Sequence, residues 1–493
     1  MEGQNVDQGL WGVLPSCASE FLMTACSIPT LRLVNRNWCQ EIGLCLKSIR
    51  FQEAKLVKEN VDFHTAVRTA SGCFPNINSV LCVFTSGDGD GGRLEHLCTA
   101  FDHRLVSLSV YGKVEAQRIQ CLTGLKDLQT LNMSGSMLHR IQDDLVHSSS
   151  LAALTELNIR GAWLGAEELA FVEPLRNLRS LNLACTKVDR LDMLSGLNKL
   201  EKLHLWSSKI GTTGVEVLGS LVNLTELDLG NTQVDDTISE HLSKLSKLTN
   251  LDVGMAKIGD KSMEMISETL NLKVLILRGT RVTDAGVGRF CAMSDLKHVD
   301  LDSTQITDEA ISHLLVLPGL ERLSLASTGL SNDGLAQIAG LSRLTNLNLN
   351  CCTSITDAGL VGIGALENLR SLSIRLGNVS DAGTPCLSSL RRLEELWVGG
   401  ELVGDVTIEH ISNLTSLTHL DMPRSGVSDL CVPHLLNLTN LTHLGLSHSR
   451  MTDSGASQLV GLPKLKKLNM VFSKVTKQCK SMLASELSML RVD

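Results

Sequence analysis

Residues 224–236 read LTELDLGNTQVDD, and this stretch decides the fold of the chain. Side chains alternate between the two faces of an extended strand, so Leu227 and Leu229 fall on one face and Asp228 falls on the other. Together with Leu224, the two later leucines are expected to point into an apolar core. The stretch therefore predicts a short strand with one buried face.

The phrase L-x-x-L-x-L of this stretch recurs along most of the chain, usually at a step of 24 residues, with single steps of 23, 26, 22 and 25. This period is the signature of a leucine-rich-repeat array. The sequence therefore predicts an α/β solenoid with parallel strands on the concave face and helices on the convex face. The fourth position of each repeat, counted from its first leucine, falls at Leu108, Leu131, Leu157, Leu181, Leu203, Leu227, Leu251, Leu275, Val299, Leu323, Leu347, Leu372, Leu396, Leu420, Leu444 and Leu468.

Two polar features recur after each predicted strand. Thr232 stands at the ninth position, where many leucine-rich repeats carry an asparagine that bonds the backbone of the neighbouring turn; a hydroxyl is expected to do a similar job. A T-D-x-G phrase then follows in many repeats, as in VTDAG at residues 282–286. A Thr or Ser before Asp suits a helix N-cap with a negative charge in the first turn, so we expect a convex helix after each strand.

Composition excludes several classes of function. Hydrophobic residues make up 43% of the 493 residues but aromatic residues only 3%, so the core is expected to consist of Leu, Val and Ile. A formal net charge of -8 gives no general field for holding a phosphate backbone, and nucleic acid is not an expected partner. Without a signal-peptide pattern or a long apolar run, we expect no membrane contact and a cytoplasmic or nuclear location. No enzyme signature occurs, so we expect no catalytic residues and no cofactor.

Cysteine and histidine positions favour neither disulfides nor a metal site. The fifteen cysteines do not cluster at ligand spacing, and those at 185, 291, 386 and 431 fall singly in different repeats. We interpret them as buried free thiols. His419, His443 and His448 lie in separate repeats without a carboxylate or thiol at ligand spacing, so no metal site is predicted.

The third, fifth and seventh residues of each repeat are expected to face solvent on the concave side, where solenoids bind partners. Asn and Asp at many fifth positions are interpreted as solvated structure. Arg and aromatic residues are the usual energetic anchors of interfaces, and they concentrate in the C-terminal third. A concave face that is merely solvated is the alternative. The candidate partner-binding residues are Trp206, Arg278, Asp302, Arg375, Trp397, Arg424, His448 and Phe472.

The segment before the repeats has a different character. It reads LPSCASEFLMTACSIPTLRLVNRNWCQEIG from residue 14, and short helices fit it better than strands. It resembles an F-box, the helical module by which substrate receptors of Skp-cullin-F-box ubiquitin ligases attach to a Skp adaptor, although it is a few residues shorter than the usual module. The resemblance rests on an opening Leu-Pro, Pro29, Arg36 and a closing hydrophobic run. It implies an adaptor-binding set of Leu14, Pro15, Leu31, Leu33, Val34 and Trp38.

These segments predict four regions. They are an F-box-like helical segment at 1–45, degenerate repeats at 46–120 with a Gly/Asp-rich loop near 86–92, regular repeats at 121–475 and a C-terminal cap at 476–493. The resemblance implies a substrate receptor that binds a Skp adaptor and a cullin and holds a protein target on the concave face. The alternative is a non-catalytic scaffold in which residues 14–45 only cap the first repeat. The T-x-V-T-D-A-G form of most repeats, which resembles bacterial and protist proteins without an F-box, favours that alternative.

Overall fold

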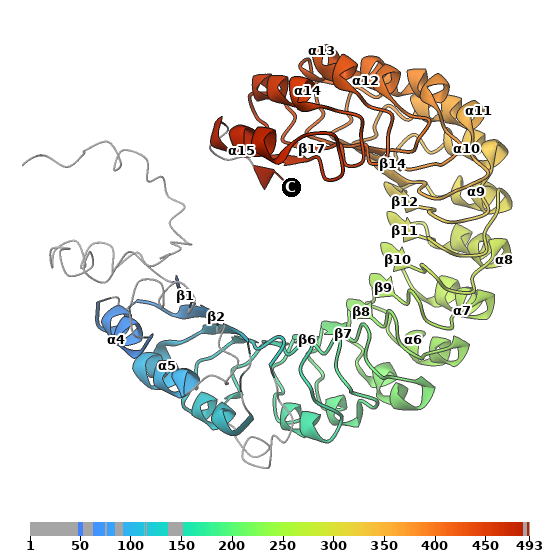
Figure 1. The fold of residues 1–493 in the computed structure, drawn as a ribbon. Helices are drawn as coiled ribbons and strands as arrows, with labels where there is room; N and C mark the ends of the chain where they lie inside the picture. Colours follow the sequence, from blue (N-terminus) through green and yellow to red (C-terminus); the bar gives the residue numbers. More distant parts are fainter. Residues whose placement is uncertain are drawn as a thin grey trace, which may run out of the picture. The chain divides into compact units, whose positions relative to one another are not determined.

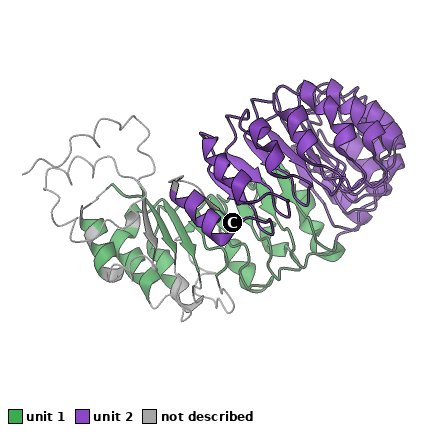
Figure 2. Cartoon of the chain, turned by 45° about the horizontal axis from the view of Figure 1, so that its top comes forward, with its two compact units in different colours: residues 1–233 green, residues 234–493 purple. Residues whose placement is uncertain are grey.

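A computed structural model describes residues 48–52, 63–73, 76–83, 92–112, 114, 116–136, 151–486 and 491–492. The F-box-like segment at residues 14–45, most of the predicted loop at 86–92 and the predicted cap residues Leu487 and Leu490 lie outside the described residues. The chain falls into two compact units, residues 1–233 and residues 234–493, which we call unit 1 and unit 2 (Figure 2).

Unit 1 holds the earlier repeats, and its strands pair in parallel in chain order. The strands are β1 (Ser48–Gln52), β2 (Ser79–Val83), β3 (Ser107–Tyr111), β4 (Thr130–Asn132), β5 (Glu156–Asn158), β6 (Ser180–Asn182), β7 (Lys202–His204) and β8 (Glu226–Asp228). The helices are α4 (Phe63–Cys73) and α5 (Arg93–Phe101), with 3₁₀ helices η2 (Asp102–Arg104), η3 (Ala116–Gly124), η5 (Glu168–Val172), η6 (Asp192–Leu194), η7 (Thr212–Gly214) and η8 (Glu216–Ser220).

Unit 2 repeats one strand and one convex segment from β9 to β19, with the strands along its inner, concave side and the helices along its outer side (Figure 1). Its strands are β9 (Asn250–Asp252), β10 (Val274–Ile276), β11 (His298–Asp300), β12 (Arg322–Ser324), β13 (Asn346–Asn348), β14 (Ser371–Ile374), β15 (Glu395–Val398), β16 (His419–Asp421), β17 (His443–Gly445), β18 (Lys467–Asn469) and β19 (Arg491–Val492). Its α-helices are α6 (Ser239–Leu242), α7 (Asp260–Thr269), α8 (Asp284–Val287), α9 (Glu309–Leu314), α10 (Asn332–Ile338), α11 (Asp357–Leu360), α12 (Asp405–Ile411), α13 (Val432–Leu435), α14 (Asp453–Gln458) and α15 (Lys477–Glu486). Its 3₁₀ helices are η9 (Asp236–Ile238), η10 (Gly288–Ala292), η11 (Val361–Ala365), η12 (Asp381–Ser389), η13 (Asp429–Cys431) and η14 (Leu459–Gly461).

The strands stand in register at the repeat period. Leu275 lies opposite Leu251 on one side and Val299 on the other, and Leu444 lies between Leu420 and Leu468 in the same way. Each of these side chains is at most 2% exposed, and fully burying one such side chain contributes about 1.5–3 kcal/mol. The predicted leucine-rich-repeat fold, with strands on one face and helices on the other, is therefore confirmed.

The convex helices are short. In unit 2, α8 and α11 have four residues each and run on into the 3₁₀ helices η10 and η11. In the described repeats of unit 1 after residue 116, the convex helices are 3₁₀ helices rather than α-helices. A 24-residue repeat leaves few residues for this side, and helices this short gain little from their own hydrogen bonds.

A turn of fixed geometry ends most strands. The fifth-position side chain accepts a hydrogen bond from the N–H of the seventh residue, over 2.8 Å between Asp252 and Gly254 and over 3.2 Å between Asn348 and Asn350. This Asx turn leads into an eighth residue with a left-handed backbone. The fifth-position row, which the sequence suggested was only solvated, therefore shapes the end of each strand.

Most of the ninth-position hydroxyls bond their own turn rather than the neighbouring one. The Oγ1 of Thr280 donates to the carbonyl oxygen of Leu277 over 2.6 Å, and the Oγ of Ser425 donates to that of Met422 over 2.8 Å. The expectation that these hydroxyls would bond the neighbouring repeat therefore holds for Ser136, which donates to the carbonyl oxygen of Gly112 over 3.4 Å, and is wrong for Thr280 and Ser425.

An aspartate ladder joins successive repeats on the convex side of unit 2. The carboxylate of Asp284, in the first turn of α8, accepts hydrogen bonds from the N–H and the Oγ1 of Thr307 in the next repeat, each over 2.8 Å. Asp357 makes the same pair of bonds to Ser380, each over 2.7 Å. Each ladder aspartate therefore holds the residue at or just before the start of the following helix, which goes beyond the predicted interaction with its own helix dipole. The aspartates of the ladder are Asp236, Asp260, Asp284, Asp308, Asp357, Asp381, Asp405, Asp429 and Asp453, with Asn332 in one place.

The ladder also explains the glycine of the T-D-x-G phrase. A Cβ built on Gly334 would lie 2.1 Å from a carboxylate oxygen of Asp308, and one built on Gly383 would lie 2.5 Å from Asp357. The glycine leaves room for the aspartate of the preceding repeat. The T-D-x-G phrase is therefore a contact between repeats rather than a local helix signal alone.

The last helix, α15, begins after the final step of the ladder at Thr476, which bonds Asp453. Leu483 of this helix is fully buried, as expected of a cap, whereas Met482 is 36% exposed. The described cysteines are free thiols, and Cys431 is buried, but Cys291 in η10 is exposed and its predicted burial is wrong. Among the described helices none is long and apolar enough to cross a membrane.

Candidate functional site

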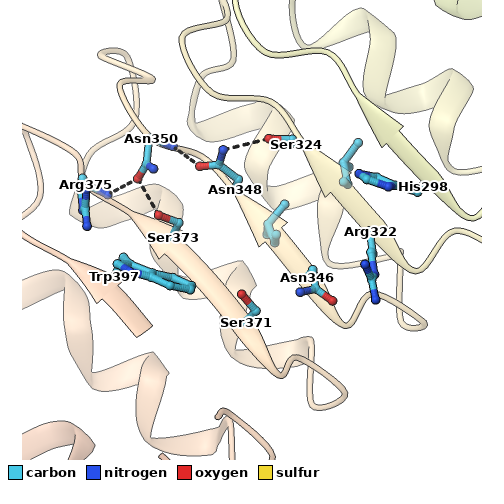
Figure 3. Close-up of a pocket in the computed structure, with 12 residues that line it drawn as sticks. His298, Arg322, Ser324, Asn346, Asn348, Asn350, Ser371, Ser373, Arg375 and Trp397 are labelled. Carbon is cyan, nitrogen blue, oxygen red and sulfur yellow. Dashed lines mark hydrogen bonds between the residues drawn. The ribbon is translucent and has the colours of Figure 1, made fainter. Parts of the chain in front are cut away.

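A groove of about 460 Å³ opens on the concave face of unit 2 across β11 to β15 (Figure 3). Its lining combines Trp397 with cationic, amide and hydroxyl groups and contains no carboxylate. The lining residues are His298, Arg322, Leu323, Ser324, Asn346, Leu347, Asn348, Asn350, Ser371, Ser373, Arg375 and Trp397.

Two serines at the fifth position make room for the groove. Ser324 and Ser373 cannot supply the amide or carboxylate of the Asx turn, so a residue of the preceding repeat supplies it. Asp302 accepts from the N–H of Ala326 over 2.7 Å and from the hydroxyl of Ser324. Asn350 accepts from the N–H of Arg375 over 2.8 Å and from the hydroxyl of Ser373 over 2.9 Å (Figure 3). The turns keep their geometry while the strand face loses two larger side chains.

The C-terminal wall of the groove departs from the repeat pattern as well. Asp421 stands at a fifth position, but the seventh residue of its repeat is Pro423, which has no N–H to donate. The carboxylate of Asp421 instead pairs with the guanidinium of Arg375, two repeats away. A Cβ on Gly445 would lie 1.9 Å from the Asp421 carboxylate, so the bridge requires glycine there. Trp397 lies opposite Asp421 in the sheet, on the strand between the two ends of this bridge.

Burial shifts several titration equilibria near the groove. Desolvation raises the pKa of Asp421, and Arg375 opposes this shift. Desolvation and the Arg322 guanidinium lower the pKa of His298. Asp300, at the end of β11, has its pKa raised to about 6, mainly by burial and also by the nearby carboxylates of Asp302 and Asp252. The exposed guanidinium of Arg322 makes no ion pair within the described residues, so it is available to a ligand.

Two histidines stack on the neighbouring strands. The rings of His419 and His443 lie 4.1 Å apart at 12°. Thr442 donates its hydroxyl proton to the carbonyl oxygen of Thr418 over 2.9 Å, so its oxygen accepts from Nδ1–H of His443 over 2.8 Å. Thr418 holds His419 in the same way. Whenever either ring is neutral, this contact places its proton on Nδ1 and its lone pair on Nε2. Burial together with His419 lowers the pKa of His443.

The structure divides the eight predicted concave residues into three sets. Trp206 lies in unit 1, half-buried just after β7. Arg278, Asp302, Arg375 and Trp397 lie on the strand face of unit 2, although the Asp302 carboxylate is taken up by the turn of the next repeat. The remaining three, Arg424, His448 and Phe472, stand at the eighth position, on the turn edge rather than the strand face.

Sequence reasoning missed the small and third-position residues of the groove. Arg322 and His298 stand at third positions, and the serines at 324 and 373 interrupt the Asn/Asp row. That interruption is visible in the sequence and could have located the groove. In the part of the chain that the structure describes, no three His, Cys, Asp or Glu side chains are grouped so as to hold a metal ion.

Comparisons with known proteins agree with this architecture. The family model for "Leucine Rich repeat" matches residues 342–364 and 437–460. No curated protein matches the sequence. Among solved structures, a leucine-rich-repeat protein of Leptospira interrogans matches at 21% identity and a TM-score of 0.51, over 76% of this chain and 91% of that one. An internalin of Listeria monocytogenes matches at 25% identity and a TM-score of 0.44, over 70% and 87%.

A third match is a plant peptide hormone receptor, RGFR1, solved in complex with RGF2, at 15% identity and a TM-score of 0.38 over 92% of this chain and 88% of that one. The matched repeats, the register of the strands and the Leptospira structure together define the class. The described chain is a leucine-rich-repeat solenoid.

Proposed function

We propose that this chain is a protein-binding subunit that captures a partner protein in the groove across β11 to β15. The groove carries the proposal, because it combines an aromatic side chain, an accessible Arg322 and a floor of amides and hydroxyls. Interfaces draw most of their energy from such Trp and Arg anchors. The departures from the repeat pattern that open the groove also support a role in binding, because the turns after Ser324 and Ser373 keep their geometry through bonds supplied by the preceding repeat.

We further propose that the captured protein is a target for ubiquitylation and that the chain is the substrate receptor of a Skp-cullin-F-box ligase. The support is the F-box resemblance of residues 14–45, placed directly before the repeats. In this proposal the other subunits of the ligase carry out catalysis, and the chain works in the cytoplasm or nucleus without a cofactor. The concave groove would then select the target.

Co-purification with a Skp adaptor tests the attachment. The full chain is expected to form a stoichiometric complex with an adaptor of its own organism. Changing Leu14, Pro15 and Trp38 to Ala should abolish the complex, whereas Trp397→Ala should leave it intact, because the groove lies in unit 2. An intact chain that binds no adaptor would refute the ligase role and leave the groove proposal standing.

A scaffold without ligase attachment is the second candidate. The T-D-x-G form of the repeats favours it, since that form resembles repeats of proteins without an F-box. In that case residues 14–45 cap the first repeat and truncating them should lower the thermal stability of unit 1. Neither the full chain nor the truncated chain should bind an adaptor. The same adaptor experiment therefore separates the two candidates.

A further inference from the structure

The eighth position has a left-handed backbone in most described repeats, with φ between 53° and 62° at the non-glycine residues that adopt it; Leu376 is an exception. A side chain at such a φ costs on the order of 1 kcal/mol. Most repeats place Gly, Ser, Asn or Cys at this position. Met255 is a single bulky residue at this position, whereas three consecutive repeats place Arg424, His448 and Phe472 there, so bulky side chains stand side by side where the backbone favours small ones.

These side chains form one continuous edge. Phe472 is 76% exposed, yet its ring stacks on that of His448 with 4.6 Å between centroids. Arg450 and Lys474, at the tenth position of the same repeats, are also exposed. We call Arg424, His448, Arg450, Phe472 and Lys474 the C-terminal edge. Adjacent strands lie about 4.8 Å apart, so the three repeats present these groups within roughly 10 Å along the stack.

The C-terminal edge contains a hollow of about 520 Å³. Arg424, Arg450 and His448 line it together with the small residues Ser425 and Gly426 and with Glu401. None of these residues lines the groove across β11 to β15, so the hollow is a second site on unit 2.

The charge of this region is opposite to that of the whole chain. Residues 417–493 contain nine Lys and Arg against five Asp and Glu, a net charge of +4 in a chain of net charge -8. Several basic residues elsewhere are paired with the next repeat, as Lys297 is with Glu321. By contrast, within the described residues Arg424, Arg450 and Lys474 have no ion pair. Their charge is therefore directed to solvent.

From this juxtaposition of unpaired cations and an exposed stacked aromatic pair, we propose that the C-terminal edge binds an acidic polypeptide segment that carries aromatic side chains. Carboxylates of the segment pair with Arg424 and Arg450 over the hollow, and an aromatic ring packs on Phe472. Guanidinium groups suit bidentate carboxylate binding, and an exposed aromatic gives the apolar anchor. A short polypeptide fits better than nucleic acid because the cations are confined to this edge, whereas the net charge of -8 gives the chain no extended positive surface for a continuous phosphate backbone.

The test uses the full chain alone, so its outcome does not depend on adaptor binding or on the groove. A fluorescent peptide of about ten residues that alternates Glu and Tyr is titrated by anisotropy, with a Lys and Tyr peptide and a single-stranded DNA of similar length as comparisons. We expect the Glu and Tyr peptide to bind, and raising the salt from about 0.05 M to about 0.5 M to weaken it as the Debye length shrinks.

Matched variants locate the site. Arg450→Glu should weaken the peptide by about tenfold or more, since one favourable charge contact is replaced by a repulsive one. Arg281→Glu changes the same tenth position in an earlier repeat of unit 2 and should have little effect. Phe472→Ser should weaken the Tyr-containing peptide more than one in which Ala replaces Tyr. Circular dichroism and thermal melting of each variant check that it is folded.

Three results would overturn the proposal. They are no binding of the Glu and Tyr peptide to the intact chain, equal losses from Arg450→Glu and Arg281→Glu, and DNA binding in preference to the acidic peptide. The second would mean that only the overall charge matters, and the third would make the edge a nucleic-acid surface.

Discussion

Removing one step of the aspartate ladder tests how the repeats of unit 2 are held together. Asp357 accepts two hydrogen bonds from Ser380, each over 2.7 Å. Hydrogen bonds to a charged group contribute about 1.5–3 kcal/mol each when buried, and Asp357 is half-buried, so about 1 kcal/mol each is a fair value. Asp357→Ala should therefore cost about 2 kcal/mol.

The control is Asp333→Ala. Asp333 also lies in the first turn of a helix, α10, but its exposed carboxylate makes no hydrogen bond within the described residues. It loses only its interaction with the helix dipole, which is worth about 0.5 kcal/mol. The two variants therefore differ in the ladder contact, which comprises the two hydrogen bonds and the packing of Asp357 against Gly383.

Native-state hydrogen exchange measures the difference, because exchange reports the opening of single repeats in an array whose unfolding is not all-or-none. In Asp357→Ala, peptides that span Ser380 should lose about thirtyfold of their protection, and those of adjoining repeats should lose less. Equal, small losses in both variants would refute the ladder as a stabilising contact.

Three further predictions follow from single residues. Asp300→Asn should raise the melting temperature above pH 6, because a pKa raised from 3.8 to about 6 means that wild-type stability falls as pH rises through that window. The gain should vanish below about pH 4. A gain that does not depend on pH would contradict the titration of Asp300 as its cause. For His443, a lowered pKa means that the folded state binds protons less readily than the unfolded chain, so stability is lost as pH falls below 6.5. His443→Gln should therefore reduce the fall in melting temperature that the wild type shows below pH 6.5. Gly445→Ala should displace the Asp421 carboxylate and lower the urea midpoint by an amount equivalent to about 1–2 kcal/mol, a loss that an unchanged midpoint would disprove.

The fold could be predicted because one signal is repeated many times. Leu227, Leu251 and Leu275 carry the same 24-residue beat, and a parallel stack is the structure that buries such a series. The T-D-x-G phrase predicted helix starts, but its contact between repeats could not be predicted without the stacked structure. Only when the repeats stack does the carboxylate of Asp308 bond Ser331, the N-cap of the next helix, and lie in the space that the missing side chain of Gly334 leaves.

The candidate site was predicted only in part. The large side chains at Arg375 and Trp397 were found from their position in the repeat, but the groove depends on residues that are small, such as Ser373, whose turn bond comes from a neighbour. Arg424 and Phe472 were assigned to the concave face because they follow the strand closely. Both residues have a positive φ, which places their side chains on the turn edge instead, and the alternation of residues along a strand does not predict this change of direction.

Site-specific photocrosslinking tests the central claim, that the groove of unit 2 captures a partner protein. Benzoylphenylalanine is introduced in place of Ser373, in the groove, and in a separate variant in place of Val361, which is 72% exposed on the convex side. In extracts of the source organism, the groove position should yield a discrete protein adduct that Trp397→Ala suppresses, and the convex position should yield none. Adducts that form equally from both positions, or that Trp397→Ala leaves unchanged, would contradict the claim.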